Sequence, residues 1–160
     1  MLGGSEVVLG FSRLGVTHIV WIPDSHLGTW EPAIAQSAIR LVRVAREGEA
    51  FALAAGLLLG GAKPIVIVQC TGFFEAGDAV RNVVHDMKLP VKMIVGVRSR
   101  LASLKGKSND NCATLTEPIV EAWKIPFVWV DPTDMTPTQL QTTLQEWWNR
   151  DSASAIVWSE

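Results

Sequence analysis

A short apolar run without polar alternation, Ile19-Val20-Trp21-Ile22, is the feature that most constrains the fold of this chain. A strand with one face in water alternates apolar and polar residues, so a continuous run indicates a strand covered on both faces. Pro23 follows and ends the strand, because proline supplies no backbone donor. Apolar runs at 64–68 and 91–97 have the same character, and together they predict a parallel sheet buried between helices.

Helical periodicity separates these runs. In residues 5–14, Val7, Val8, Phe11 and Leu14 fall on one face, as in an amphipathic helix that ends at Gly15. Six strands alternating with helices predict an α/β fold with an open, mostly parallel six-stranded sheet and helices on both faces. The 160 residues match the usual size of one domain, so we expect a single domain over 1–160. The expected strands are 17–22, 41–45, 64–68, 91–97, 127–130 and 154–158, and the expected helices are 5–14, one from Asp24 or Ser25 into the thirties, 48–59, one from 74 through the eighties, 112–123 and 137–148.

Open parallel sheets bind ligands outside the carboxyl ends of their strands. The segments to search are therefore 23–28, 45–49, 69–75 and 98–108, and we expect 69–73 and 98–111 to be loops. The second loop is the one candidate for a mobile segment. It carries four basic residues, Arg98, Arg100, Lys105 and Lys107, which fit a solvated loop and anion recognition about equally well.

Composition excludes several classes of function. The formal net charge is −2, so no basic field favours nucleic acid or an anionic membrane surface. No apolar stretch is long enough to span a membrane, and the N-terminus lacks a basic region followed by an apolar core, so we expect a soluble, unprocessed, cytoplasmic protein. The two cysteines and three histidines lie on separate elements, and their spacing predicts no metal site.

Two further motifs fail on inspection. Gly106-Lys107-Ser108 ends like a phosphate loop, but Leu101 stands where the first glycine of that motif belongs. Cys70 follows a strand, yet His85 lies several helical turns away, so the sequence predicts a buried structural cysteine rather than a nucleophile.

Glu47 stands where the second strand gives way to an Ala-rich helix. A first-turn acid complements the helix dipole, and by that argument Glu49 would serve equally well. The whole segment 47–56 separates the two: its small residues allow close packing of the helix, and Glu47 is left at the strand–helix junction.

This segment resembles the pyrimidine-binding (PYR) domain of thiamine-diphosphate enzymes, in which a Glu is followed by an Ala-rich helix and by a Gly nine positions later. Glu47 and Gly56 match that spacing. The stretches 22–27, 69–73 and 116–127 are similar to the phosphonopyruvate and sulfopyruvate decarboxylase group, and the resemblance covers nearly the whole chain. This sequence departs from the family pattern at Cys70-Thr71, where Asn-Ser is usual, and at residues 73–75.

The resemblance implies the PYR-domain fold and a role for each matching residue. Glu47 would hydrogen-bond the pyrimidine ring of thiamine diphosphate, favour its imino tautomer and so activate the cofactor. The other residues implied in the site are a second catalytic residue, His26; cofactor contacts from Gln69, Thr71, Gly72 and Phe73, mainly through the backbone; and substrate contacts from Pro23, Asp24, Ser25 and Arg98, with Arg100, Lys105 and Lys107 as other candidates for the substrate anion.

The resemblance also implies a partner. In the family, a Gly-Asp-Gly motif on a second domain holds the diphosphate and its Mg²⁺, whereas here Gly77-Asp78 is followed by Ala79. A β subunit carrying that domain is therefore expected, in a hetero-oligomer with several copies of each chain. The reaction implied is decarboxylation of a small anionic 2-oxo acid, sulfopyruvate or phosphonopyruvate, by this α subunit. Carboligation, another 2-oxo acid, and a non-catalytic α/β binding module remain as alternatives.

Overall fold

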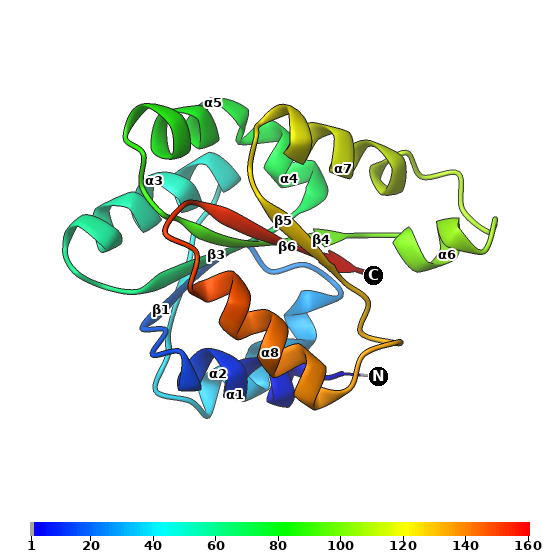
Figure 1. The fold of residues 1–160 in the computed structure, drawn as a ribbon, viewed down its shortest axis with the longest axis horizontal. Coiled ribbons are helices and arrows are strands. Elements are labelled where there is room, and N and C mark those ends of the chain that lie inside the picture. The colour runs from blue at the N-terminus through cyan, green and yellow to red at the C-terminus, as the bar shows by residue number, and fades with distance from the viewer. Residues whose placement is uncertain (1) are drawn as a thin grey trace.

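Six parallel strands form one open sheet at the centre of the chain. The computed structural model describes residues 2–160, and Figure 1 shows the sheet between two helical layers. The strand order is β2-β1-β3-β4-β6-β5, and every neighbouring pair is parallel. The strands are β1 (His18–Trp21), β2 (Arg40–Arg43), β3 (Pro64–Gln69), β4 (Lys92–Val97), β5 (Phe127–Val130) and β6 (Ser154–Ser159). The predicted fold class is therefore confirmed.

Helices cover both faces of this sheet, as right-handed crossovers between parallel strands require. The helical elements are α1 (Gly4–Arg13), η1 (Leu27–Trp30), α2 (Glu31–Ala35), α3 (Glu47–Leu59), α4 (Cys70–Glu75), α5 (Gly77–Val80), η2 (Arg81–Asp86), α6 (Arg100–Leu104), α7 (Cys112–Ala122) and α8 (Pro137–Trp148). In Figure 1, α1, α2 and α8 lie on one side of the sheet, and α3, α4, α5 and α7 lie on the other.

Two apolar cores fill the spaces between the layers. Alternate residues of β3 serve both: Ile65 and Ile67 pack toward α1 and α8, while Val66 and Val68 pack toward α3 and α4. All four side chains are fully buried, as the unbroken apolar run predicts. The edge strand β2 is only partly buried, so its sequence lacks such a run.

The chain reverses direction across the sheet between β1 and β3. From β1 it moves outward to β2 and then returns to β3 on the other side of β1. Ligand crevices of open α/β sheets lie outside the carboxyl ends of the strands at such a switch point. Residues that follow β1, β2 and β3 are therefore the ones to inspect for a site.

Two loop predictions were wrong. The segment 69–73 is not a loop, because Gln69 is the last residue of β3 and α4 begins directly at Cys70. The following helical stretch is not continuous, because Ala76 (φ −75°, ψ 5°) separates α4 from α5.

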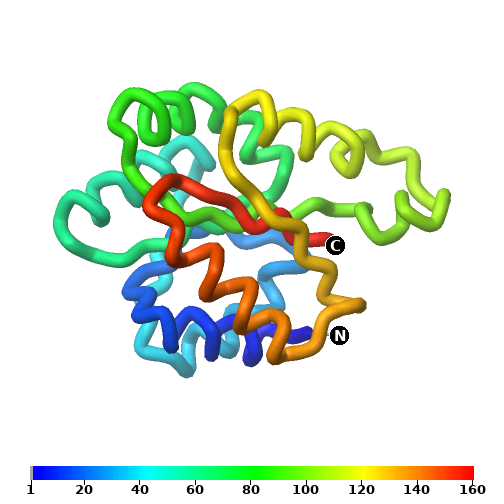
Figure 2. The backbone as a smooth tube through the Cα atoms, viewed as in Figure 1, coloured from blue at the N-terminus to red at the C-terminus, as the bar shows by residue number. Residues whose placement is uncertain are grey.

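The segment 98–111, predicted to be a loop, contains the short helix α6, and Ser99 before this helix has a left-handed backbone (φ 62°). Asp110 links the two ends of the segment, because its Oδ2 accepts from Arg98 Nε (2.9 Å) and its Oδ1 accepts from Cys112 N (2.9 Å). Figure 2 shows this segment projecting beyond the carboxyl end of the sheet. None of the helices described in residues 2–160 is long and apolar enough to cross a membrane.

Candidate active site at the carboxyl ends of the strands

Glu47 is the first residue of α3, just beyond β2. The two acids of this first turn, indistinguishable by the dipole argument, differ in the structure. Glu49 Oε2 accepts a hydrogen bond from Ala45 N (3.0 Å) and so caps the junction. Among residues 2–160, no donor lies within hydrogen-bond distance of the Glu47 carboxyl group, which is half buried. Glu47 is therefore the acid that remains able to bind another molecule.

The Glu47 side chain rests on the backbone of Gly72 in α4. A Cβ atom at Gly72 would lie 2.2 Å from both Cγ and Oε1 of Glu47. Only glycine leaves room for the carboxyl group in this position. The resemblance implied a backbone contact between Gly72 and the cofactor, and the structure places the side chain of Glu47 against this glycine.

The other residues of the segment 69–73 differ in their exposure to solvent. Gln69 is half buried and Thr71 is exposed, with Thr71 Oγ1 donating to Gln69 Oε1 (3.4 Å). Phe73 is fully buried and packs on Phe51, with ring centroids 6.4 Å apart. Its ring belongs to the core, which leaves only its backbone for the predicted cofactor contact.

Cys70 is also fully buried, which confirms the structural role predicted for it. Burial, and then the nearby Cys112 thiol, raise the pKa of Cys70 to about 11, so the thiol stays protonated at neutral pH. Burial and the raised pKa both disfavour a thiolate nucleophile at this position.

Asp24 organises the turn that follows β1. Its Oδ1 accepts from the backbone N–H groups of His26 (2.7 Å) and Leu27 (2.8 Å), which stabilises the turn before η1. The single helix predicted from Asp24 or Ser25 into the thirties is instead the 3-10 helix η1, which begins at Leu27, followed by the short helix α2. This turn presents Pro23, Ser25 and His26 at the surface. Ser25 and His26 also line a cavity of about 350 Å³ with apolar walls that include Trp30 and Trp158.

Glu160, just after β6, is a site residue that sequence reasoning missed. Its carboxyl oxygens are buried, and Oε1 lies so close to β4 that a Cβ at Gly96 would be 2.3 Å away. Burial first, and then the charge of Asp24, raise the pKa of Glu160 to about 7, while Gln69 and Arg98 act in the opposite direction. The available signal was a charged residue directly after the apolar strand 154–158, at a strand's carboxyl end.

The four basic residues proposed for anion binding have different surroundings. Arg98 is paired with Asp110 (2.9 Å). Arg100 Nη1 donates to Ala113 O (3.1 Å), and its guanidinium lies 4.4 Å from the centroid of the Trp129 ring. Lys105 and Lys107 are exposed on the projecting segment. Of the four, Arg98 is the one whose charge acts on Glu160 at the strand ends, where it lowers the pKa of the carboxyl group.

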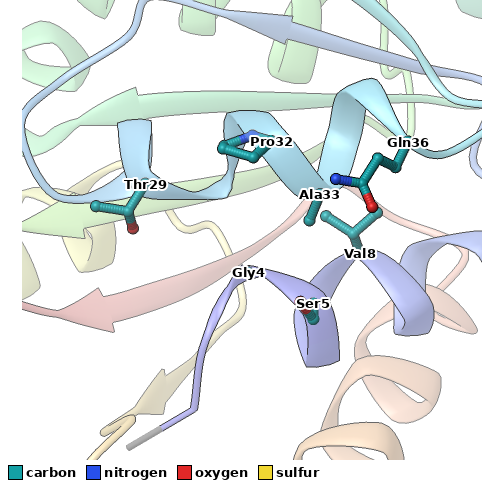
Figure 3. Close-up of a pocket in the computed structure, with 7 residues that line it drawn as sticks. All are labelled: Gly4, Ser5, Val8, Thr29, Pro32, Ala33 and Gln36. Carbon is teal, nitrogen blue, oxygen red and sulfur yellow. The ribbon is translucent and has the colours of Figure 1, made fainter.

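A second cavity, of about 310 Å³, adjoins the one at Ser25 and His26, since Thr29 lines both. Figure 3 shows its lining residues between α1 and α2. Its lining residues are Gly4, Ser5, Val8, Thr29, Pro32, Ala33 and Gln36. None of these seven is charged, so this cavity offers no acid or base for catalysis.

The chain is similar to known decarboxylases. Over 101 residues it is 34% identical to phosphonopyruvate decarboxylase from Streptomyces viridochromogenes and 33% identical to that from Streptomyces hygroscopicus. Each match covers 62% of this chain, and the chain spans 25% of each relative. No family model matches the chain.

The fold is also found in a solved structure. The crystal structure of benzoylformate decarboxylase from Polynucleobacter necessarius superimposes with a TM-score of 0.69 at 18% identity, covering 99% of this chain and 30% of that one. At this identity the likeness concerns the fold alone. The curated matches confirm the resemblance to the phosphonopyruvate decarboxylase group that the sequence predicted, and the solved structure confirms the α/β fold that this resemblance implies.

Proposed function

We propose that residues 1–160 form one pyrimidine-binding domain of a thiamine-diphosphate-dependent 2-oxo acid decarboxylase. The observation that carries the proposal is the Glu47 carboxyl group. It is half buried, it has no hydrogen-bond donor among the described residues, and a glycine holds it at the carboxyl ends of the strands. A carboxyl group in that setting is suited to exchange a proton with a ring nitrogen.

The residues present fit the cofactor. Glu47 would hold the pyrimidine nitrogen through its unpartnered carboxyl group, while Gln69 and Thr71, which reach the surface beside it, would contact the same ring. Gly72 and Phe73 would contribute backbone contacts. When bound, thiamine diphosphate supplies the electron sink that decarboxylation of a 2-oxo acid requires. The tasks of this chain are to orient that ring and to exchange a proton with it at Glu47.

A second polypeptide or domain completes the site in this proposal. Glu47, Gln69 and Thr71 are not enclosed by this chain, so a partner surface is needed to exclude water from the reaction. The matched 101 residues make up 25% of each relative, which makes the relatives about 2.5 times as long as this chain and leaves room in them for a further domain. We propose that a β subunit supplies the diphosphate and Mg²⁺ site, in a hetero-oligomer with several copies of each chain.

Phosphonopyruvate is the first substrate to test, because the relatives act on it by name, and sulfopyruvate is the second. In this proposal Asp24 and Ser25, with Pro23, shape the turn that meets the substrate. His26 transfers a proton, and Arg98 draws the substrate anion toward the strand ends.

The test compares two substitutions in the same helical turn, Glu47→Gln and Glu49→Gln. Each is measured in the chain assembled with its partner, by release of carbon dioxide and by calorimetric binding of thiamine diphosphate with Mg²⁺. Glu47→Gln should lower turnover by at least about 100-fold, because glutamine cannot exchange the proton. Glu49→Gln keeps an oxygen for Ala45 N and should behave like the parent.

Other outcomes separate the alternatives. Equal activity of Glu47→Gln and the parent would contradict the proposal. Cofactor-dependent condensation without free aldehyde would indicate a carboligase, and failure of the assembly to bind thiamine diphosphate would favour a binding module.

A further inference from the structure

A further cavity lies at the opposite edge of the sheet, where the strands begin. It has a volume of about 230 Å³, and residues at or just before the starts of β3, β4 and β6 line it. Its charged lining residues are Lys63, Lys92, Arg150 and Asp151. The residues proposed for the reaction lie at the carboxyl ends of the strands, so this cavity is separate from them.

Lys92 places a buried positive charge at this cavity. The residue is only 6% exposed, and its Nζ donates to Arg150 O (2.6 Å), Ser152 O (2.9 Å) and Ser154 Oγ (3.1 Å). All three acceptors are neutral, so they satisfy the donors of the ammonium group without neutralising its charge. The same hydrogen bonds hold the segment 150–154, which brings Arg150 to the cavity wall.

Two further cations at the cavity have no acid partner. Among residues 2–160, no ion pair includes Lys63 or Arg150. Burial first, and then the charge of Arg150, lower the pKa of Lys92 to about 8, whereas Asp151 acts in the opposite direction. Three cations and one carboxylate give the lining a net charge of +2 while Lys92 is protonated. A dianion would match that charge.

The helix dipole explains part of this cluster. Lys63 and Arg150 follow the C-termini of α3 and α8, where a cation is favoured. Lys124 has the same kind of position after α7, but it lines a different cavity. The dipole does not explain Lys92, which begins a strand and is buried at the same cavity as the other two cations.

The remaining lining residues are apolar: Leu58, Pro64, Pro90 and Trp148. The volume is below the about 300–1,000 Å³ of cavities that hold drug-sized ligands, so the ligand must be small. We propose that this cavity binds a small phosphate monoester, with its dianionic phosphoryl group at Lys63 and Arg150 and its carbon skeleton against Trp148. The site goes beyond the proposed function and does not rest on it.

Calorimetric titration of this chain, without thiamine diphosphate, tests the site. The probes are inorganic phosphate and phenyl phosphate, and sodium chloride at equal ionic strength is the blank. Phenyl phosphate should bind about tenfold more tightly than inorganic phosphate, because its ring adds contact with Trp148. Arg150→Gln and Lys63→Gln should each weaken binding of phenyl phosphate about tenfold, because each removes a charged donor. Both variants keep the backbone groups that bond Lys92 and Thr17.

The matched control is Lys124→Gln, which removes a cation after a helix end but outside this cavity and should leave the affinity unchanged. Circular dichroism establishes that each variant is folded. A parent chain that does not bind phenyl phosphate would overturn the site. An equal loss of affinity in Lys124→Gln would also overturn it, because the attraction would then come from the general charge of this edge. Equal affinities for the two probes would overturn the ester and leave inorganic phosphate as the ligand.

Discussion

Gly72→Ala should separate folding from activity, because the three atoms nearest to the methyl group it adds all belong to the Glu47 side chain. The new Cβ would lie 2.2 Å from Cγ and Oε1 of Glu47 and 2.4 Å from its Cδ. Ordinary contact between such atoms needs about 3.4 Å, so the carboxyl group must move by about 1 Å or more. A displacement of that size in a catalytic group costs about 100-fold in rate, or about 3 kcal/mol of activation free energy.

The cost to folding should be small. Glu47 is half buried and can turn toward solvent, and alanine is a better helix former than glycine by about 1 kcal/mol. We therefore expect the free energy of unfolding of Gly72→Ala to lie within about 1 kcal/mol of the parent value, while kcat of the assembled enzyme falls about 100-fold. Denaturant titration and carbon dioxide release measure the two quantities.

Gly56→Ala in α3 is the comparison for stability, because no atom lies within 4 Å of the added Cβ. It should gain up to about 1 kcal/mol, which calibrates the helix-propensity contribution. The reasoning fails if Gly72→Ala retains full turnover. It also fails if Gly72→Ala unfolds the chain, because the loss would then be structural and unrelated to the position of Glu47.

Three further predictions concern stability. Lys92 is buried, and its Nζ contacts Arg150 O, Ser152 O and Ser154 Oγ; burial lowers its pKa to about 8 from 10.5. Between these values the unfolded chain binds the proton that the folded chain has released, so the free energy of unfolding should rise with pH over this window, and Lys92→Met should remove the rise in denaturant titrations. Thr136→Ala deletes the hydroxyl group that accepts from Gln139 N (3.3 Å) at the start of α8 and should lower the free energy of unfolding by about 1 kcal/mol, measured by thermal unfolding. Thr136→Ser keeps the hydroxyl group and should leave the stability near the parent value. Ile67→Ala at a fully buried site should cost about 2–5 kcal/mol, whereas Leu59→Ala at a site that is 67% exposed should change stability by less than about 0.5 kcal/mol; similar losses would show that burial is not the cause.

Local patterns in the sequence were sufficient to predict most of the fold. Each buried strand is a run of adjacent apolar residues and each helix a nearby periodic pattern, so short-range information specifies them. The runs around Ile19 and Ile65 were therefore located within one or two residues, and alternation of strands with helices implied the parallel sheet. The boundary at Gln69 was misplaced because the segment after it contains Gly72, which is typical of loops, whereas packing of Phe73 into the core stabilises a helix there.

The sequence by itself determined the fold class, the strand ends where a site could lie, and the choice of Glu47 as its central residue. Only the tertiary structure shows that Glu49 accepts a hydrogen bond within the chain while Glu47 does not, because this depends on which backbone N–H meets each carboxyl group. Likewise, only the sheet order, in which β6 lies beside β4, brings the Glu160 carboxyl group against Gly96. Contacts between residues so far apart in the chain leave no local pattern, because they are decided by which strands become neighbours and by what the packed layers bury.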